Sequence, residues 1–371
     1  MDALSYIIIT FSLIGALDRI LGNRFGLGKE FEKGFMLFGT MALSMIGMII
    51  ISPFIADIMT PFLDFVSSVL HIDPSIIPAS LFANDMGGAP LAVEVAKNEE
   101  IGLFNAMVVS SMMGCTISFT LPFALGMVDK EHHRELLLGL LCGVVTIPIG
   151  CFVSGLICSI QLMTLVANLM PLIIFSAVIA FGLIRFPSAC VKVFNMFGYF
   201  IKVVITIGLL LGIIRFLSGF ELIKGLETLE AGAAVCLNAS VVMSGAFPFM
   251  YVVSKVLAKP LKALSGRIGI NEISALGFIS SLATSVTTFG MMDKMDNKGI
   301  MMNSAFAVSA AFTFAGHLAF TLAFDRTFIM PMIVGKLISG ALALLLSVVV
   351  FNKSNTVPKC YEKKCEFISH E

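Results

Sequence analysis

Charged side chains are scarce in this sequence, and tryptophan is absent. Only 13% of the residues are charged, and 24 Lys and Arg balance 24 Asp and Glu, so the charge gives no reason to expect nucleic acid as a partner. By contrast, 58% of the residues are hydrophobic, more apolar surface than a soluble domain of 371 residues can bury in its own core. We therefore expect an all-α integral membrane protein whose first partner is the lipid bilayer.

Signatures of enzymes and metal sites are also missing. The loop Glu-His-His-Arg-Glu at 131–135 lacks the His-Glu-x-x-His spacing of a zinc protease, and Cys360, Cys365 and His370 match no zinc pattern. The remaining cysteines fall in or beside apolar runs, where cysteine packs as a small hydrophobic residue: Cys115, Cys142, Cys151, Cys158, Cys190 and Cys236. We expect no metal, no cofactor and no enzymatic activity, which disfavours an intramembrane enzyme or a sensor subunit.

Apolar runs of about 20 residues, the length that crosses a bilayer, recur along the chain. The N-terminus lacks the basic segment and cleavage site of a secretory signal, so the first run is expected to remain as a helix. The runs predict nine spans: Leu4–Leu21, Gly34–Ser52, Gly102–Met127, Leu136–Ile157, Leu162–Ile184, Val193–Phe216, Ala231–Val253, Gly299–Phe324 and Phe328–Phe351.

Two stretches, Pro53–Lys97 and Lys255–Lys298, do not read as simple spans. Each begins with an amphipathic piece (Ile55–Leu70 and Val256–Leu264) and ends in a segment interrupted by small and polar residues. Either could cross the membrane or enter it and return. The positive-inside rule favours two re-entrant hairpins, because this choice places most Lys and Arg residues on the cytoplasmic side. It also predicts an external N-terminus and a cytoplasmic C-terminus.

The two halves of the chain resemble each other at an offset of about 198 residues, as in the inverted repeats of secondary transporters. Asn105-Ala-Met-Val-Val-Ser-Ser aligns with Asn303-Ser-Ala-Phe-Ala-Val-Ser, and the order of spans and broken segments is shared. Convergence of two apolar stretches is the alternative. The predicted units are an N-terminal helix with a basic loop (1–33), repeat 1 with its hairpin (34–160), connecting helices (161–228), repeat 2 with its hairpin (229–352) and a disordered cytoplasmic tail (353–371).

Two segments resemble one particular family. They are Gly15-Ala-Leu-Asp-Arg-Ile-Leu-Gly-Asn-Arg-Phe-Gly-Leu-Gly-Lys-Glu-Phe-Glu-Lys-Gly-Phe-Met and Ala83-Asn-Asp-Met-Gly-Gly-Ala-Pro-Leu-Ala. Over about residues 1–352 the chain is similar to the ethanolamine-utilisation membrane proteins, the EutH-type permeases. The resemblance implies a protein of the bacterial cytoplasmic membrane that takes up ethanolamine by facilitated diffusion, ahead of its breakdown by a cobalamin-dependent lyase.

The first hairpin carries the leading candidate for the binding site. Protonated ethanolamine needs a carboxylate or carbonyl oxygens for its ammonium and a hydrogen-bonding group for its hydroxyl. Asp85 lies within Asn84-Asp85-Met86-Gly87-Gly88, at the expected tip, where glycines permit close approach of a ligand. The alternative is that Asp85 caps the helix that returns from the tip.

Other polar residues at membrane depth are weaker candidates. The second hairpin offers hydroxyl groups for the alcohol end of a substrate, chiefly Thr284, Ser285 and Thr288, although such groups more often bond to their own backbone. Three amides in spans could line the same cavity or join helices: Asn105, Asn238 and Asn303. His317 could serve a proton-coupled step, but a structural role is more common for a single buried histidine.

Two further expectations concern coupling and assembly. A proton- or ion-coupled symporter for another small amine or polar solute is the alternative function, since architecture alone does not name a solute. The small residues Gly139 and Gly143 could support a homodimer.

Overall fold

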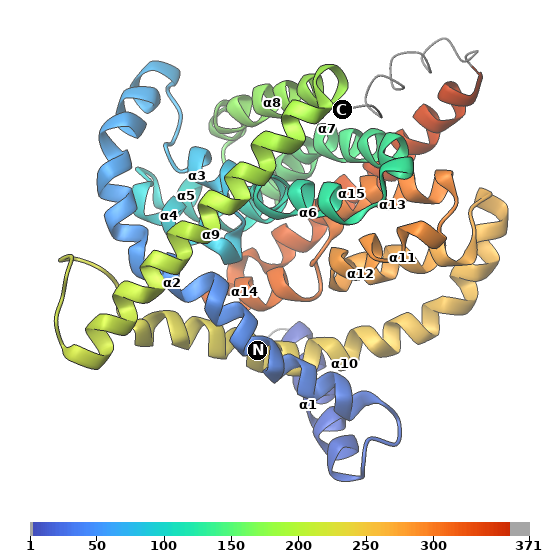
Figure 1. Cartoon of the computed structure of the whole chain (residues 1–371), viewed down its shortest axis with the longest axis horizontal. Coiled ribbons are helices and arrows are strands. Elements are labelled where there is room, and N and C mark those ends of the chain that lie inside the picture. Colours follow the sequence, from blue (N-terminus) through green and yellow to red (C-terminus); the bar gives the residue numbers. More distant parts are fainter. Residues whose placement is uncertain (1–2, 357–371) are drawn as a thin grey trace.

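The computed structural model describes residues 3–356, and every regular element in that range is a helix (Figure 1). The elements are α1 (Ala3–Ile20), α2 (Leu27–Leu70), α3 (Ile76–Leu81), η1 (Asn84–Met86), α4 (Gly88–Val95), α5 (Glu99–Phe104), η2 (Asn105–Gly114), η3 (Thr116–Thr120), α6 (Leu121–Met127), η4 (Lys130–His132), α7 (His133–Ile157), α8 (Leu162–Arg185), α9 (Pro187–Ser218), α10 (Leu229–Ile268), α11 (Glu272–Ala283), α12 (Ser285–Phe289), η5 (Met292–Lys294), α13 (Asn297–Ala310), α14 (Gly316–Phe324), η6 (Arg326–Phe328) and α15 (Ile329–Thr356).

Within the described range, seven helical segments are long and apolar enough to cross a membrane. They are Leu27–Leu70, Glu99–Met127, Lys130–Ile157, Leu162–Arg185, Pro187–Ser218, Leu229–Pro260 and Arg326–Lys353. The prediction of an all-helical, multi-pass membrane protein is confirmed. The count of nine stays a prediction, with α1 and the α13–α14 pair as the two further spans. Of the predicted tail, 353–356 continues α15, and 357–371 lies outside the described residues.

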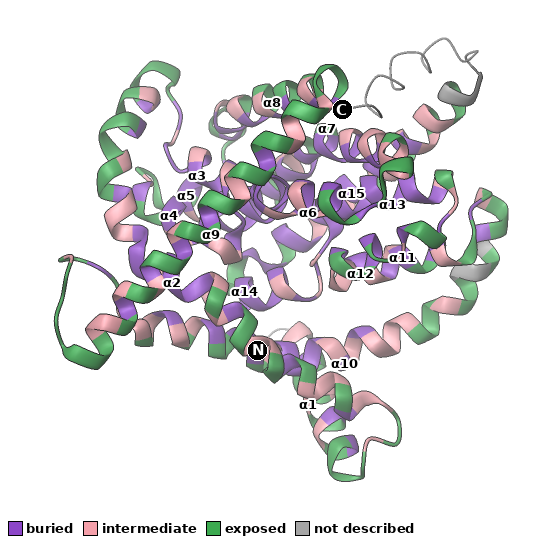
Figure 2. Ribbon diagram, in the orientation of Figure 1, coloured by how far each residue is buried: buried purple, intermediate pink, exposed green. Residues whose placement is uncertain are grey.

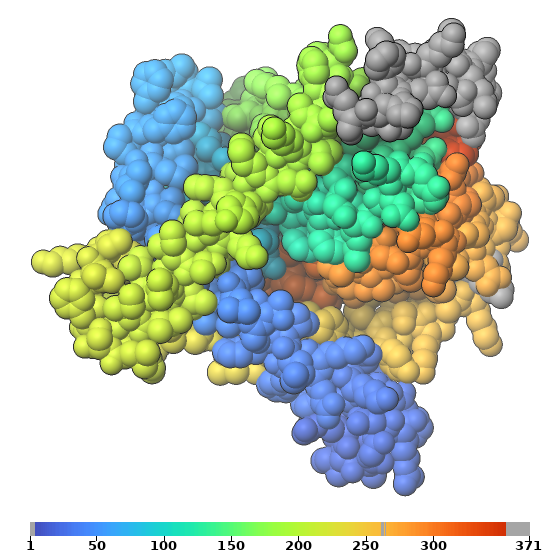
Figure 3. All heavy atoms as spheres, in the orientation of Figure 1, coloured from blue at the N-terminus to red at the C-terminus, as the bar shows by residue number. Residues whose placement is uncertain are grey.

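The segment 99–127 forms the centre of the molecule, because 83% of its most apolar window is buried, against 22% for α9. Figure 2 shows the buried ribbon gathered around α6, α13 and α15, with exposed residues along α8 and α9. In Figure 3, α9 lies across the visible face of the molecule. Its exposed side chains include Met196, Tyr199 and Phe200. Such an apolar outer surface fits contact with lipid.

Helices α2 and α10 are longer than predicted, with 44 and 40 residues. The amphipathic pieces Ile55–Leu70 and Val256–Leu264 continue the preceding spans and do not form separate helices. Each helix runs through two prolines, which remove hydrogen bonds but which packing against neighbouring helices tolerates in a membrane protein. The predicted spans end at Ser52 and Val253, whereas the helices themselves continue to Leu70 and Ile268.

Small residues let α2 and α10 cross closely. A side chain on Gly34 would overlap the backbone of Ser244, and one on Gly232 would meet Ile46 at 3.0 Å. Because the partner number falls as the α2 number rises, the two helices run antiparallel. Close approach through small residues is the usual way in which helices pack in membranes, because the hydrophobic effect does not drive helices together in lipid.

Two flanking helices pack on this pair in matching ways. Gly47 of α2 lies against Ile205 in α9, while Gly245 of α10 lies against Ile8 in α1. Gly47 and Gly245 are separated by about 198 positions, the offset noted between the two halves of the sequence. The α9–α2 contact therefore has a counterpart in the α1–α10 contact.

The helices α7 and α15 also pack antiparallel. Ser154 donates a hydrogen bond to the carbonyl oxygen of Pro331 at 2.8 Å, and Ser339 donates to Thr146 at 3.2 Å. The small-residue face at Gly139 and Gly143 packs against α13 of the same chain, where a side chain would overlap Met301 and Val308. Those glycines are therefore filled internally and do not offer the dimer contact suggested by the sequence.

Hairpin 1 (residues 73–98) is closed at its base by Asp73. The Asp73 carboxylate accepts hydrogen bonds from the backbone N–H groups of Ser75 at 3.0 Å, Lys97 at 3.0 Å and Asn98 at 2.9 Å. The two ends of this segment therefore lie together, and the chain returns to the side from which it started.

Hairpin 2 (residues 271–296) has the same closure with the acid and the amide exchanged. Asp296 accepts from the Asn271 N–H and from the Ser274 hydroxyl, both at 2.8 Å. The Asn271 side chain in turn donates to the Lys294 carbonyl at 2.8 Å. An acid and an amide thus join the base of each hairpin: Asp73 with Asn98 in the first, and Asn271 with Asp296 in the second.

Two helices of the interior are irregular. The predicted span Gly299–Phe324 is broken, because α13 ends at Ala310 and α14 starts at Gly316, with Phe312 at φ 63° between them. The opposite segment 99–127 is continuous, but η2 and η3 are π-helices. A π-helix is rare, and its shifted hydrogen bonds are often found at functional sites.

We predict that Asp73→Ala lowers the free energy of unfolding by about 2 kcal/mol or more. The reason is that three backbone N–H groups lose the carboxylate that accepts their hydrogen bonds. Thermal unfolding of the purified protein in detergent measures this. The matched control is Asp64→Ala, which removes an exposed ion pair with Lys97 at 2.7 Å and should change stability much less. Equal losses in both variants would contradict the assigned closure.

Candidate functional site: two hairpin tips at a broken helix

The tip of hairpin 1 is built by a short extended segment and a left-handed glycine. Ala83 donates its backbone N–H to the Ser118 hydroxyl at 3.1 Å, and Gly88 donates to the Ala83 carbonyl at 2.7 Å. Gly87 has φ 98°, and a side chain there would overlap Met48. Glycine is therefore required at Gly87, and α4 can begin immediately after the tip.

Asp85 projects from this tip toward the start of α14. A methyl group on Gly316 would lie 3.8 Å from Oδ2 of Asp85, and the first turn of α14 has no side-chain cap. The positive end of a helix dipole stabilises a carboxylate in this position. Helix α4 likewise has no side-chain cap hydrogen bond, so Asp85 does not cap the returning helix. Asp85 is only half-buried, whereas the neighbouring Asn84 has no exposed surface.

Asn84 stands out because neither polar atom of its buried side chain has a hydrogen-bond partner. A buried, unpaired amide costs free energy, so such a group in a native protein calls for an explanation. Met86, two residues after Asn84, is half-buried at the end of the same turn. The tip thus presents a carboxylate and an unsatisfied amide side by side.

The tip of hairpin 2 supplies hydroxyl groups. Thr284 caps α12 by accepting from the Val286 N–H at 3.2 Å, and Thr288 joins the two arms through the Gly277 carbonyl at 3.1 Å and the Ser281 hydroxyl at 2.9 Å. Both hydroxyls therefore have structural partners. Ser285 is fully buried, and its hydroxyl has none.

Both tips reach the break between α13 and α14. Phe312 and Phe314 donate their backbone N–H groups to Ser281 and Leu282, at 3.0 Å each, so hairpin 2 holds the non-helical segment in place. Asp85 of hairpin 1 reaches the end of that segment at Gly316. Non-helical backbone at membrane depth is tolerated where protein partners satisfy it or where it lines a polar cavity.

Two of the three amides predicted in spans are buried, and the third is exposed. Asn105 bonds to Ser75 at 2.8 Å and exchanges hydrogen bonds with Asn168, and Asn303 donates to the Ser274 carbonyl at 2.8 Å, so both join a hairpin to a span. Asn238 lies on the exposed side of α10, contrary to the expectation of a buried amide.

A buried polar cluster beside Asp85 was not predicted as a unit. Lys336 of α15, only 1% exposed, donates to the Ser111 carbonyl of the π-helix at 2.8 Å and lies 3.0 Å from Nδ1 of His317. Thr321 is one turn below His317, with an unpartnered hydroxyl. The sequence signal for this cluster is the single lysine within the apolar run that forms α15, since a charged residue within a membrane helix usually has a function.

Acidic side chains gather near the base of hairpin 1. Partial burial raises the pKa of Glu94, and the nearby negative charges of Glu227 and Asp57 raise that pKa further. Three carboxylates within electrostatic reach of each other attract cations to this end of the molecule.

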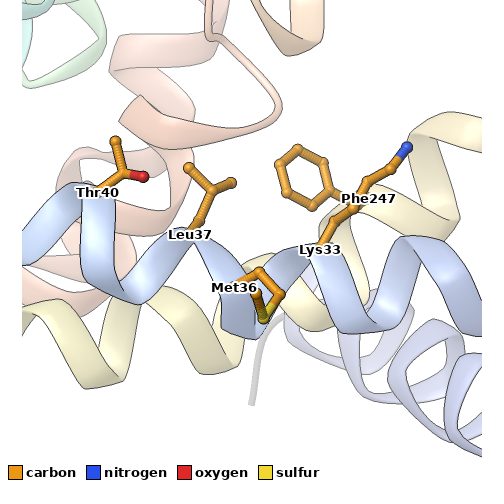
Figure 4. A pocket seen from close by; sticks show the side chains of 5 residues that line it. All are labelled: Lys33, Met36, Leu37, Thr40 and Phe247. Atoms are coloured by element: carbon orange, nitrogen blue, oxygen red, sulfur yellow. The ribbon is translucent and has the colours of Figure 1, made fainter.

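Other surface features do not coincide with the tips. Figure 4 shows a shallow groove between α2 and α10 that is lined by Lys33, Met36, Leu37, Thr40 and Phe247, none of which belongs to a hairpin. Among the described residues, no group of three or more His, Cys, Asp or Glu side chains could hold a metal ion.

Long apolar helices, two closed hairpins and polar tips at a broken helix define a class, that of multi-pass membrane proteins built like small-molecule transporters. Comparison with known families then identifies the particular one. The chain belongs to the family described as ethanolamine utilisation protein, EutH, whose model matches residues 1–350. The resemblance seen in the sequence is confirmed.

Individual relatives cover almost the whole chain. A probable ethanolamine permease EutH of Listeria monocytogenes serotype 1/2a is 40% identical over 362 residues, covering 98% of this chain and 97% of the relative. The probable ethanolamine permease EutH of Salmonella typhimurium is 36% identical, covering 95% and 96%. An uncharacterised protein, YxeR, of Bacillus subtilis is 37% identical, covering 92% of each. No solved structure matches the chain.

We predict that Gly114→Ala displaces the tip of hairpin 1, because the new methyl group would overlap the Phe82 carbonyl oxygen. Overpacking of this kind costs about 2 kcal/mol, which thermal unfolding would register. Gly126→Ala on the same helical stretch is the control, since its side chain would enter open space. An unchanged melting temperature in Gly114→Ala would contradict the tight seat of the tip.

Proposed function

We propose that this protein carries protonated ethanolamine across the bacterial cytoplasmic membrane and that Asp85 is the counter-ion of the ammonium group. The observation that carries the proposal is the half-buried Asp85 carboxylate at a hairpin tip, with no ion-pair partner within 4.0 Å among the described residues. A carboxylate at membrane depth is costly, so it is retained where it has a task. The names of the relatives supply ethanolamine as the substrate.

The substrate hydroxyl has two candidate partners in this proposal. The Asn84 amide and the Ser285 hydroxyl are buried without hydrogen bonds, one at each tip. An amide offers both donors and an acceptor, which suits a hydroxyl group that needs both. Ethanolamine places its hydroxyl two carbons from the ammonium, so adjacent residues such as Asp85 and Asn84 can engage its two ends together.

The proposed architecture is an inverted repeat with two re-entrant hairpins. It is supported by the matching contacts of Gly47 and Gly245, which are 198 positions apart. It is supported also by the two acid–amide closures, in which Asp73 corresponds to Asn271 and Asn98 to Asp296 at the same offset of 198. Hairpin 1 would enter from outside and hairpin 2 from the cytoplasm, with the N-terminus outside and the C-terminus cytoplasmic. Alternating access would then open the tips to one side at a time.

A second candidate function is proton-coupled symport of a small amine or polar solute. The contact between His317 and Lys336 favours it, because an imidazole and an amine in contact can pass a proton. In a symporter, acidification outside proteoliposomes would accelerate uptake, whereas facilitated diffusion of the ammonium would follow its own concentration gradient.

We expect Asp85→Asn to reduce uptake of labelled ethanolamine into proteoliposomes by roughly a hundredfold, because a charge-assisted pair in a partly dry site is lost. A binding titration with ethanolamine should show the same loss. The exposed Asp129→Asn variant is the matched control and should transport normally. Wild-type uptake by Asp85→Asn would remove Asp85 from the site.

We expect Asn84→Ala to weaken ethanolamine binding by about tenfold, the size of one hydrogen bond, while leaving ethylamine binding unchanged. Ethylamine has the ammonium but lacks the hydroxyl. Calorimetric titration of both amines against both proteins measures this difference. If the two amines weaken equally, the Asn84 amide does not contact the hydroxyl.

A further inference from the structure

Lys336 is held in the interior by two acceptors and no direct counter-charge. Its Nζ donates to the Ser111 carbonyl at 2.8 Å and contacts Nδ1 of His317 at 3.0 Å. Within the described part of the chain, none of the ion pairs within 4.0 Å includes Lys336. A buried cation in this setting depends on more distant charges for its stability.

The number of hydrogen bonds fits a lysine that can be neutral. An uncharged amine has two N–H groups, which the Ser111 carbonyl and the His317 Nδ1 accept in full when the His317 proton is on Nε2. An ammonium has a third N–H and a full charge, and these find no acceptor in the described contacts. The direct hydrogen bonds of Lys336 therefore fit the neutral amine, and its ammonium form depends on a charge that lies further away.

The groups that face Lys336 leave one source of negative charge. His317 lies on α14, Cys115 at the junction of η2 and η3, Cys151 on α7 and Asp85 on η1, and each of them interacts electrostatically with Lys336. Burial disfavours the thiolate form of a cysteine and the imidazolium form of a histidine, so Cys115, Cys151 and His317 are taken as neutral. The charge on Lys336 is consequently balanced by Asp85 and by no other facing group.

From this arrangement we infer that Lys336 is a proton-exchanging residue that loses its proton when a substrate ammonium binds at Asp85. The inference rests on the proposed function, because it takes Asp85 as the substrate's counter-ion. In the empty protein, Asp85 and Lys336 together are neutral. When an ammonium arrives, one N–H bond of Lys336 breaks, its electron pair stays on Nζ, and the proton is released to water. The site then holds one cation beside the Asp85 carboxylate before and after binding, and its net charge stays zero.

The binding experiment compares pH and proton release. At pH 6 to 8 a primary aliphatic amine is almost fully protonated, so a proton that appears on binding comes from the protein. Calorimetric titration of the full-length protein with ethanolamine, in buffers of different ionisation enthalpy, should give close to one released proton per ethanolamine. In the pH range where one proton is released, the dissociation constant should fall by about tenfold for each unit by which the pH rises.

Variants of Lys336 separate proton exchange from a purely structural role. Lys336→Met should still bind ethanolamine, with no proton release and no dependence on pH, because the competing cation is gone. Lys336→Arg keeps a charge that cannot be lost, so it should bind at least about tenfold more weakly at every pH. Lys202→Met, which alters an exposed lysine of α9, should behave as the wild type. Thermal unfolding identifies any variant that does not fold. If one of the two Lys336 variants does not fold, the other one provides the test.

The outcomes distinguish the two levels of the proposal. If the wild type binds ethanolamine without releasing a proton, or if Lys336→Met still releases one, the exchange at Lys336 is overturned and the proposed transport function stands. If Lys336→Met only lowers the melting temperature and retains the wild-type pH dependence, the residue is a structural tether. If the wild type does not bind ethanolamine at all, the proposed function itself is overturned.

Discussion

A carboxylate inside a membrane protein must be compensated, and the positions of several elements of this structure follow from that requirement. Asp85 faces the uncapped start of α14, and Lys336 supplies the facing positive charge from α15. Neither group forms a close pair that would neutralise Asp85 permanently. Partial compensation keeps the carboxylate stable in an empty protein and still available to an incoming cation.

The irregular backbone around the site is arranged so that its polar groups remain satisfied. The break between α13 and α14 exposes the N–H groups of Phe312 and Phe314, which hairpin 2 accepts. The π-helical stretch opposite presents the Ser111 carbonyl to Lys336. Each irregularity therefore has partners from another part of the chain, which is the condition for non-helical backbone in a membrane. The closures at Asp73 and Asp296 fix both hairpins so that their tips can meet this break.

The sequence predicts those features whose signal is local. Polar and glycine residues at Asn84, Asp85 and Gly87 interrupt an apolar segment, so the tip of hairpin 1 could be located. Features that depend on distant partners were missed. Pro53 suggests a helix end, yet α2 continues because tertiary packing compensates for the lost hydrogen bond. The break near Phe312 has no local signal, because its partners are in hairpin 2, and Lys336 has its carbonyl partner 225 positions away.

Charge bookkeeping at the site also bears on how the protein changes conformation. A carrier that reorients with an unbalanced charge must move that charge through a low-dielectric interior, which costs several kcal/mol or more. Under the proposed exchange, the empty site is neutral with Asp85 and Lys336 both charged, and it is neutral again with the substrate bound and Lys336 deprotonated. Both forms that must reorient then carry the same local charge. The proposed exchange would therefore remove the difference in electrostatic cost between reorienting the loaded and the empty carrier.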